Sequence, residues 1–377
     1  MPTRAKNNKT GFLAWLRAQF RKRPLPVGFV IAGDILLLGL ALVVFSLFHH
    51  VLPSKLESIG IVSERESVQV VQPSTVPTQI ASPQETPQAG GESSQISQQA
   101  SSTPQAEVTP TPAPTEAVAR VGDFSRLYAD KFTATEASME QVGENQMLYQ
   151  SPNLYLTFTK YVQSNLVFYV ADFYIRDISQ FRTALAEDTY GKGYRERTED
   201  IAARNDALIA INGDYYGMRD SSVVIRNGVL YRDSPFQDVC VLYWDGTMET
   251  YSNVEFNATE VMENGAYQAW GFGPMLLDEN GQTMTEFHSS VNVRNPRTAI
   301  GYFAPGHYCF VVVDGRSSES RGVTTAELSL LMYNLGCVRG YNLDGGQTSV
   351  MAWDGKVVNQ PVDGGRSCSD IVMITEG

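Results

Sequence analysis

Hydrophobic and polar positions divide this chain of 377 residues into four stretches. Residues 1–26 are polar and basic, and residues 27–48 are almost wholly apolar. Residues 49–120 are rich in Ser, Thr, Pro and Gln, whereas residues 121–377 alternate apolar runs with turn residues. A polar, Pro-rich segment buries too little apolar surface to offset the entropy of ordering it. We therefore expect one large domain, residues 121–377, behind a disordered linker.

Most apolar runs of this domain are short and alternate with polar residues, as is typical of β-strands. Asn227-Gly228 and Asp245-Gly246 predict tight hairpin turns, because these pairs accept positive φ. Strands or hairpins are expected at 153–161, 165–175, 207–211, 223–231, 239–251, 297–302, 308–313, 341–343, 350–353 and 371–374. Many strands joined by short turns indicate largely antiparallel pairing.

Three helices are expected among these strands, at 177–187, 195–204 and 324–335. The third has the clearest signals, because Thr324 and Glu327 form a capping-box pattern and apolar residues then recur at the helical period. The predicted fold class is α+β, with mixed, largely antiparallel β-sheets and a few packed helices.

The apolar run 27–48 is long enough to cross a bilayer at about 1.5 Å per residue. Basic residues precede it, so the positive-inside rule places residues 1–26 in the cytoplasm. A cleaved signal peptide is the alternative, but the run is longer than a usual signal core and has no small-x-small cleavage site. We predict a single-pass signal anchor in the cell membrane, with the C-terminal domain extracellular.

Charge is distributed unevenly along the chain. The formal net charge is -12, yet seven of the 29 Lys and Arg residues lie in the first 23 positions. The rest of the chain is strongly acidic, which disfavours nucleic acid as a partner.

Motifs of several common catalytic classes are absent. The chain has no GxSxG, HExxH or GxxxxGK[ST] sequence, and the domain has only two histidines, His288 and His307. The four cysteines contain no CxxC pair, which disfavours a zinc ribbon, and they allow three complete disulfide pairings between which the sequence does not choose. Catalysis would therefore rest on carboxylates, amides and arginines.

Four polar clusters, three of which contain glycine, adjoin apolar strands: Asn212–Gly217, Arg294–Ala299, Asp314–Arg316 and Asn342–Ser349. Asp-Gly and Asn-Gly are ordinary turn pairs, but strand ends also present reactive groups. The last cluster offers two glycines and several small donors, so its backbone N–H groups could close on an anion. Cationic help for a phosphate would come from Arg297, Arg316 or Arg366.

Five short motifs occur in the order NGDYYG, GFGPMLL, RNPRTAIGY, VVVDGR and YNLDGGQTSVM. In this order they resemble the phosphodiester glycosidase family, over about residues 207–374. The resemblance implies cleavage between an anomeric carbon and a phosphate oxygen.

The resemblance also suggests roles for individual residues. The departing phosphate monoester has a second pKa of roughly 6, so it leaves without strong acid assistance. The oxocarbenium-like centre needs a carboxylate as nucleophile or base, and Asp314 and Asp344 are the first candidates, with Asp214 third. Candidates for substrate binding are Asn212, Arg297, Arg316, Gly345, Gly346 and Thr348, and Tyr215 or Trp270 could stack on the sugar. The sequence shows no requirement for a cofactor; a divalent cation is compatible with the acidic clusters, but no ligand spacing identifies a metal site.

The leading hypothesis is a membrane-anchored extracytoplasmic hydrolase that acts on a sugar-1-phosphodiester of cell-surface glycan or exopolysaccharide. One alternative is a non-catalytic glycan-binding module of the same fold, because Asp214 and Gln347 stand where the family usually has glycine. Another is an envelope-assembly module, for which Asp34 in the anchor would contact a partner.

Overall fold

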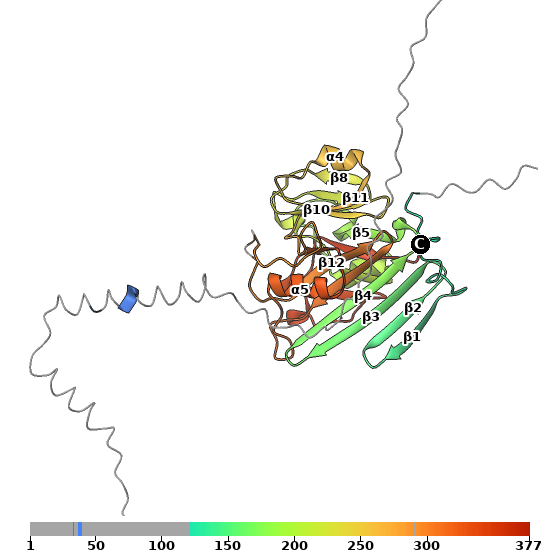
Figure 1. Ribbon diagram of the computed structural model, residues 1–377, viewed down its shortest axis with the longest axis horizontal. Coiled ribbons are helices and arrows are strands. Elements are labelled where there is room, and N and C mark those ends of the chain that lie inside the picture. Colours follow the sequence, from blue (N-terminus) through green and yellow to red (C-terminus); the bar gives the residue numbers. More distant parts are fainter. Residues whose placement is uncertain (1–32, 34–36, 40–120, 288, 290) are drawn as a thin grey trace, which may run out of the picture. The chain divides into compact units, whose positions relative to one another are not determined.

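A computed structural model describes Gly33, residues 37–39 and residues 121–377 apart from 288 and 290 (Figure 1). The chain forms two units, residues 1–57 and 58–377. In the first unit the four described residues are helical. None of the described helices has the length and apolar character needed to span a membrane. Nearly all of the predicted anchor 27–48, and the whole of the predicted linker 49–120, lie outside the described residues.

The largest sheet has seven strands in the order β1-β2-β3-β4-β13-β12-β14. Their bounds are β1 Ser138–Gly143, β2 Gln146–Gln150, β3 Leu154–Gln163, β4 Leu166–Ile175, β13 His307–Val313, β12 Arg297–Ala304 and β14 Arg339–Asn342. The four N-terminal strands form a meander, and the later strands extend it beyond β4 (Figure 1). The hairpin predicted from 153–161 and 165–175 is confirmed as β3 and β4.

Two five-stranded sheets complete the domain, in the orders β10-β9-β11-β7-β8 and β16-β15-β6-β17-β5. The first comprises β10 Met248–Tyr251, β9 Val239–Tyr243, β11 Ala266–Trp270, β7 Val224–Arg226 and β8 Val229–Arg232. The second comprises β16 Lys356–Val357, β15 Met351–Trp353, β6 Ile209–Asn212, β17 Asp370–Ile374 and β5 Phe181–Leu185. Neighbouring described strands pair antiparallel in all three sheets, which confirms the predicted α+β class with largely antiparallel sheets.

The described α-helices of the domain are short: α3 Thr198–Arg204, α4 Ala258–Glu263 and α5 Thr325–Asn334. The capping box of α5 is confirmed, since Thr324 Oγ1 accepts from the Glu327 N–H at 3.1 Å and Glu327 Oε2 accepts from the Thr324 N–H at 2.7 Å. The helix predicted at 195–204 is shorter than expected and begins at Thr198.

The helix predicted at 177–187 is wrong. Asp177 and Gln180 do form a capping box, but it starts only a 3-10 turn, η2 Ile178–Gln180. The chain then continues as β5, which pairs with β17, and a second 3-10 turn, η3 Ala186–Asp188, follows. Phe181 packs into the central core, whereas Ala184 packs into the separate cluster that includes residues of α3, so side chains on both faces of this strand are buried.

One hydrophobic core joins the three sheets. It combines Phe173 and Phe310 of the seven-stranded sheet with Trp270 of the second sheet and with Ile211 and Val372 of the third. The opposite face of the large sheet is covered by α5 (Figure 1), while α4 packs on the second sheet and α3 on the third. Side chains at the ends of β6, β14 and β17 are therefore brought together.

Candidate active site

Two of the predicted turns meet where β6 and β14 end. The Asp344 N–H donates to the Gly213 carbonyl at 3.3 Å, and Asn212 Nδ2 donates to the Asp344 carbonyl at 2.8 Å. Asn212 Oδ1 also accepts from Thr298 Oγ1 at 2.7 Å, and the residue is fully buried. Asn212 was predicted to bind substrate, but in this structure its side chain connects two turns.

Asp344 is held by an arginine that comes from a different turn. Its Oδ2 accepts from Arg366 Nη2 at 2.9 Å, and its Oδ1 accepts from the Gly345 N–H at 2.9 Å. Arg366 Nε donates to Thr348 Oγ1 at 3.0 Å, so the buried Thr348 orients the guanidinium. Burial raises the pKa of the Asp344 carboxyl, and the charge of Arg366 opposes this shift.

Asp344 and Arg366 line a small pocket that is open to solvent. The residues around it are Arg195, Tyr215, Met218, Asp344, Arg366, Ser367, Cys368 and Ser369. Arg366 and Arg219 both lie over the Tyr215 ring, each 5.4 Å from its centroid. Arg195 is exposed and makes no hydrogen bond or ion pair with the described residues. With Asp344 ionised, these side chains give the pocket an excess of one positive charge.

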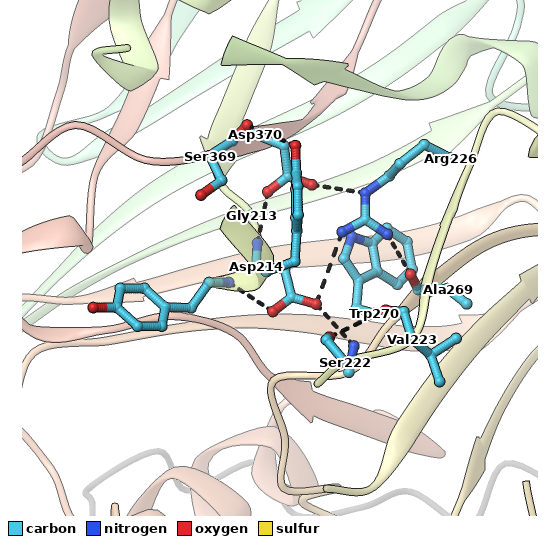
Figure 2. Close-up of polar contacts among 12 residues, drawn as sticks. Gly213, Asp214, Ser222, Val223, Arg226, Ala269, Trp270, Ser369 and Asp370 are labelled. Carbon is cyan, nitrogen blue, oxygen red and sulfur yellow. Dashed lines mark hydrogen bonds and ion pairs between the residues drawn. The ribbon is translucent and has the colours of Figure 1, made fainter. Parts of the chain in front are cut away.

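Asp214 belongs to a buried ionic cluster beside this pocket. Figure 2 shows its carboxylate facing Arg226, which also contacts Asp370. Arg226 Nε donates to Asp370 Oδ2 at 2.7 Å, whereas its Nη2 lies 3.8 Å from Asp214 Oδ2. The Asp214 N–H donates to Asp370 Oδ1 at 2.8 Å. Asp214 is only 2% exposed, so it lies behind the pocket wall.

Backbone groups satisfy the rest of the Asp214 carboxylate. Its Oδ2 accepts from the Gly271 N–H at 2.8 Å and its Oδ1 from the Tyr215 N–H at 2.6 Å. The cluster therefore fixes the turn that carries Tyr215 into the pocket. A Cβ at Gly213 would overlap the Asp370 carboxylate, which explains the glycine.

Burial raises the pKa of Asp370 to about 6, because two carboxylates share one guanidinium away from water. Arg226 opposes this shift and Asp214 adds to it. The cluster thus holds a proton more readily than an exposed aspartate would.

Asp314, the other first candidate for catalysis, lies elsewhere. It follows β13, which lies two strands away from β14 in the sheet. At the usual strand spacing the axes of these two strands are roughly 10 Å apart. Its carboxylate accepts from Asn359 Nδ2 at 2.8 Å and from the Gln360 N–H at 3.1 Å. Burial raises its pKa. It does not line the pocket of Asp344, so the structure does not bring these two carboxylates together.

Of the three arginines predicted to bind phosphate, Arg366 lines the pocket, whereas Arg297 and Arg316 do not. Arg297 is buried and donates to the carbonyls of Val323 at 3.2 Å and of Val293 at 2.6 Å, and burial lowers its pKa to about 10. Arg316 is exposed, and its Nη2 donates to Asn295 Oδ1 at 2.7 Å.

The glycines that follow Asp344 are explained by close backbone packing. A Cβ at Gly345 would lie 2.9 Å from the Pro296 carbonyl oxygen, and the Gly346 N–H donates to the same oxygen at 3.0 Å. Gly346 also has a φ of +69°. Gln347 Nε2 donates to Asp363 Oδ2 at 2.7 Å, so its side chain is tied to a neighbouring turn.

Sequence reasoning missed Arg195, Arg226 and Asp370. Arg226 is the last residue of a short buried strand, and Asp370 is the first residue of another. A charged residue next to an apolar run was the sequence feature that could have identified these two as a buried ion pair. Of the two predicted stacking residues, Tyr215 lines the pocket and Trp270 is fully buried in the core. Within residues 121–287, 289 and 291–377, no group of three or more His, Cys, Asp or Glu side chains could hold a metal ion.

A protein-family model matches the part of the chain that contains the candidate site. Residues 205–375 match the family model described as phosphodiester glycosidase, and all five sequence motifs lie inside this range. Residues 205–375 therefore form a domain that is similar to the phosphodiester glycosidase family. The recognition made from the motifs is thereby confirmed, and a glycosidase type of function is supported.

One curated relative matches this chain over part of its length. The SPbeta prophage-derived uncharacterized protein YomE of Bacillus subtilis (strain 168) is 33% identical over 186 residues, which cover 46% of this chain and 29% of that protein. The chain thus spans less than a third of the length of this relative.

Two solved structures are similar at low sequence identity. The zebrafish N-acetylglucosamine-1-phosphodiester alpha-N-acetylglucosaminidase catalytic domain, auto-inhibited by its pro-peptide, has a TM-score of 0.49 at 19% identity and covers 64% of this chain and 89% of that chain. A hypothetical protein from Synechocystis has a TM-score of 0.48 at 13% identity and covers 64% of each chain.

Proposed function

We propose that this phosphodiester glycosidase-like domain hydrolyses a sugar-1-phosphodiester in the pocket lined by Arg195, Tyr215, Asp344 and Arg366. The observation that carries the proposal is the pairing of Asp344 with Arg366 at the pocket surface. The net positive charge of the pocket suits the single negative charge of a phosphodiester.

The arginines would bind the phosphate. Arg366 Nη1 makes no hydrogen bond to any described residue, and Arg195 has none either, so both have donors free for phosphate oxygens. Guanidinium groups bind phosphate in a bidentate manner and stabilise the charge that develops on the leaving phosphate.

Asp344 would act at the anomeric carbon, as a nucleophile or as a base for water. Its raised pKa makes it a stronger base than an exposed aspartate, while Arg366 keeps it ionised. Tyr215 would set the position of Arg366 through the contact between ring and guanidinium.

The proposed setting of the reaction is the outer face of the cell membrane. The apolar run 27–48 and the basic residues before it support an anchor with the domain outside. The substrate would then belong to cell-surface glycan or exopolysaccharide.

The test uses the full chain in detergent and sugar-1-(4-nitrophenyl phosphate) diesters that differ in the sugar. Cleavage on the sugar side of the phosphorus releases 4-nitrophenyl phosphate, which gives colour only after added phosphatase, and cleavage at the anomeric carbon places the oxygen of the attacking water in the sugar. Cleavage at the aryl–oxygen–phosphorus linkage gives colour without phosphatase. We expect phosphatase-dependent colour with at least one sugar.

The matched variants are Asp344→Asn and Asp314→Asn. We expect the first to lower kcat/KM by about 10³-fold or more, and the second to stay within about tenfold of wild type. Retained turnover in Asp344→Asn would refute the assignment. Glycan binding without turnover would instead support a non-catalytic module, and neither binding nor turnover would favour the envelope-assembly alternative.

A further inference from the structure

Two of the four cysteines lie side by side in the core. Cys309 is in the middle of β13, and Cys337 lies between α5 and β14. Their sulfur atoms are 3.7 Å apart, and both residues are fully buried. Cys240 has no cysteine contact, and Cys368 contacts Thr198 Oγ1 at 3.4 Å. The structure therefore singles out one pairing from those that the sequence left open.

The residue beneath the two sulfurs is a glycine whose backbone does not require glycine. Gly301 of β12 is paired with Cys309 and is not among the residues with positive φ. A Cβ at this position would lie 2.6 Å from Cys309 Sγ and 2.6 Å from Cys337 Sγ. The missing side chain thus leaves the space in which the two sulfurs meet.

We propose that Cys309 and Cys337 form a disulfide bond when the protein folds under oxidising conditions. The sulfurs must approach from 3.7 Å to about 2.0 Å, and the space that Gly301 leaves open is where they would meet. Two S–H bonds are lost and one S–S bond forms. The two electrons and two protons pass to a low-molecular-weight disulfide such as oxidised glutathione, which is reduced to two thiols.

The bond forms during folding and not in the finished domain. Both cysteines are fully buried in the folded domain, so an oxidant in solution does not reach their sulfur atoms there. The sulfur atoms are accessible before α5 covers this face of the sheet.

The bond would fasten the part of the sheet that leads to the candidate site. It spans 28 positions and connects β13 with the segment entering β14, across the intervening strand β12. Closing a loop of this size restricts the unfolded chain and stabilises the fold. The inference does not depend on the proposed glycosidase activity.

The test is a peptide map of the full chain, refolded with oxidised and reduced glutathione, alkylated, and cut with trypsin without reduction. Cys309 lies in tryptic peptide 298–316 and Cys337 in peptide 322–339. We expect these peptides to be linked, with a mass lower than their sum by two hydrogen atoms, and to separate on reduction. The oxidised protein should melt roughly 5–10 °C above the reduced protein.

The matched controls are Cys337→Ser, which should remove the linked peptide, and Cys240→Ser, which should retain it. Peptides 298–316 and 322–339 recovered singly, each with an alkylated thiol, would overturn the proposal. So would linkage of either peptide to those carrying Cys240 or Cys368. If Cys337→Ser does not fold, the wild-type map alone gives the answer.

Discussion

The cluster of Arg226, Asp214 and Asp370 makes a quantitative prediction about stability. Replacing Arg226 by methionine would leave two buried carboxylates, 2% and 0% exposed, without their cation. Arg226 also donates to the Ile225 carbonyl at 2.9 Å and to the Ala269 carbonyl. Removing one partner of a buried ion pair typically costs about 3–5 kcal/mol. We expect Arg226→Met to lose that much unfolding free energy at pH 8.

The cost should depend on pH, and the sign follows from Asp370. Its folded pKa of about 6 is above its unfolded value, so its contribution to stability is full below about pH 4 and is lost as pH rises through 6. Without Arg226, which lowers this pKa, the carboxyl would titrate at still higher pH. A neutral carboxyl needs no cation, so the cost of Arg226→Met should be smaller at pH 5 than at pH 8, by about 1 kcal/mol or more.

The assay is urea unfolding followed by tryptophan fluorescence at the two pH values. Arg232→Met is the matched control, because Arg232 donates to the carbonyls of Tyr216 and Arg219 and has no ion-pair partner among the described residues. Its cost should be the same at pH 5 and pH 8. An Arg226→Met cost below about 1 kcal/mol, or one that does not change with pH, would refute the reasoning.

Three further predictions concern single residues. Thr324→Ala should cost about 1 kcal/mol in urea unfolding, because the N-cap of α5 is lost; no loss would contradict the capping-box assignment. Gly345→Ala should cost about 1–3 kcal/mol in thermal unfolding, because the added Cβ would press on the Pro296 carbonyl; an unchanged melting temperature would contradict this. Arg195→Ala should raise KM for a sugar-1-phosphodiester about tenfold with an unchanged melting temperature, since this exposed side chain makes no hydrogen bond or ion pair with the described residues; an unchanged KM would remove Arg195 from the phosphate site.

The sequence predicted local structure best where one signal extended over a whole element. The alternation in 153–161 and 165–175 continued long enough to specify the hairpin of β3 and β4. The segment 177–187 failed because its helix-start signal, the capping box of Asp177 and Gln180, governs only one turn. Pairing with β17 then fixed Phe181–Leu185 as a strand, and this partner lies almost 190 positions further along the chain.

The candidate site was only partly predictable for the same reason. Asp344 and its glycines stand together in the sequence, so their turn could be recognised from local chemistry. The contact between Arg226 and Asp370 joins residues 144 positions apart. Only the packing of the second sheet against the third brings them together, and no local pattern encodes that.

Burial alone does not separate the three candidate carboxylates, because Asp214, Asp314 and Asp344 are all buried. Their partners do separate them. Asp314 is satisfied by an amide and a backbone N–H, and Asp214 by two backbone N–H groups near Arg226. Asp344 alone is paired with a cation that is itself partly exposed in a pocket, so a bound phosphate could reach the guanidinium that holds the carboxylate. A substrate phosphate that accepts hydrogen bonds from Arg366 would weaken the ion pair between Arg366 and Asp344. The Asp344 carboxylate would then be free for the proposed reaction at the anomeric carbon.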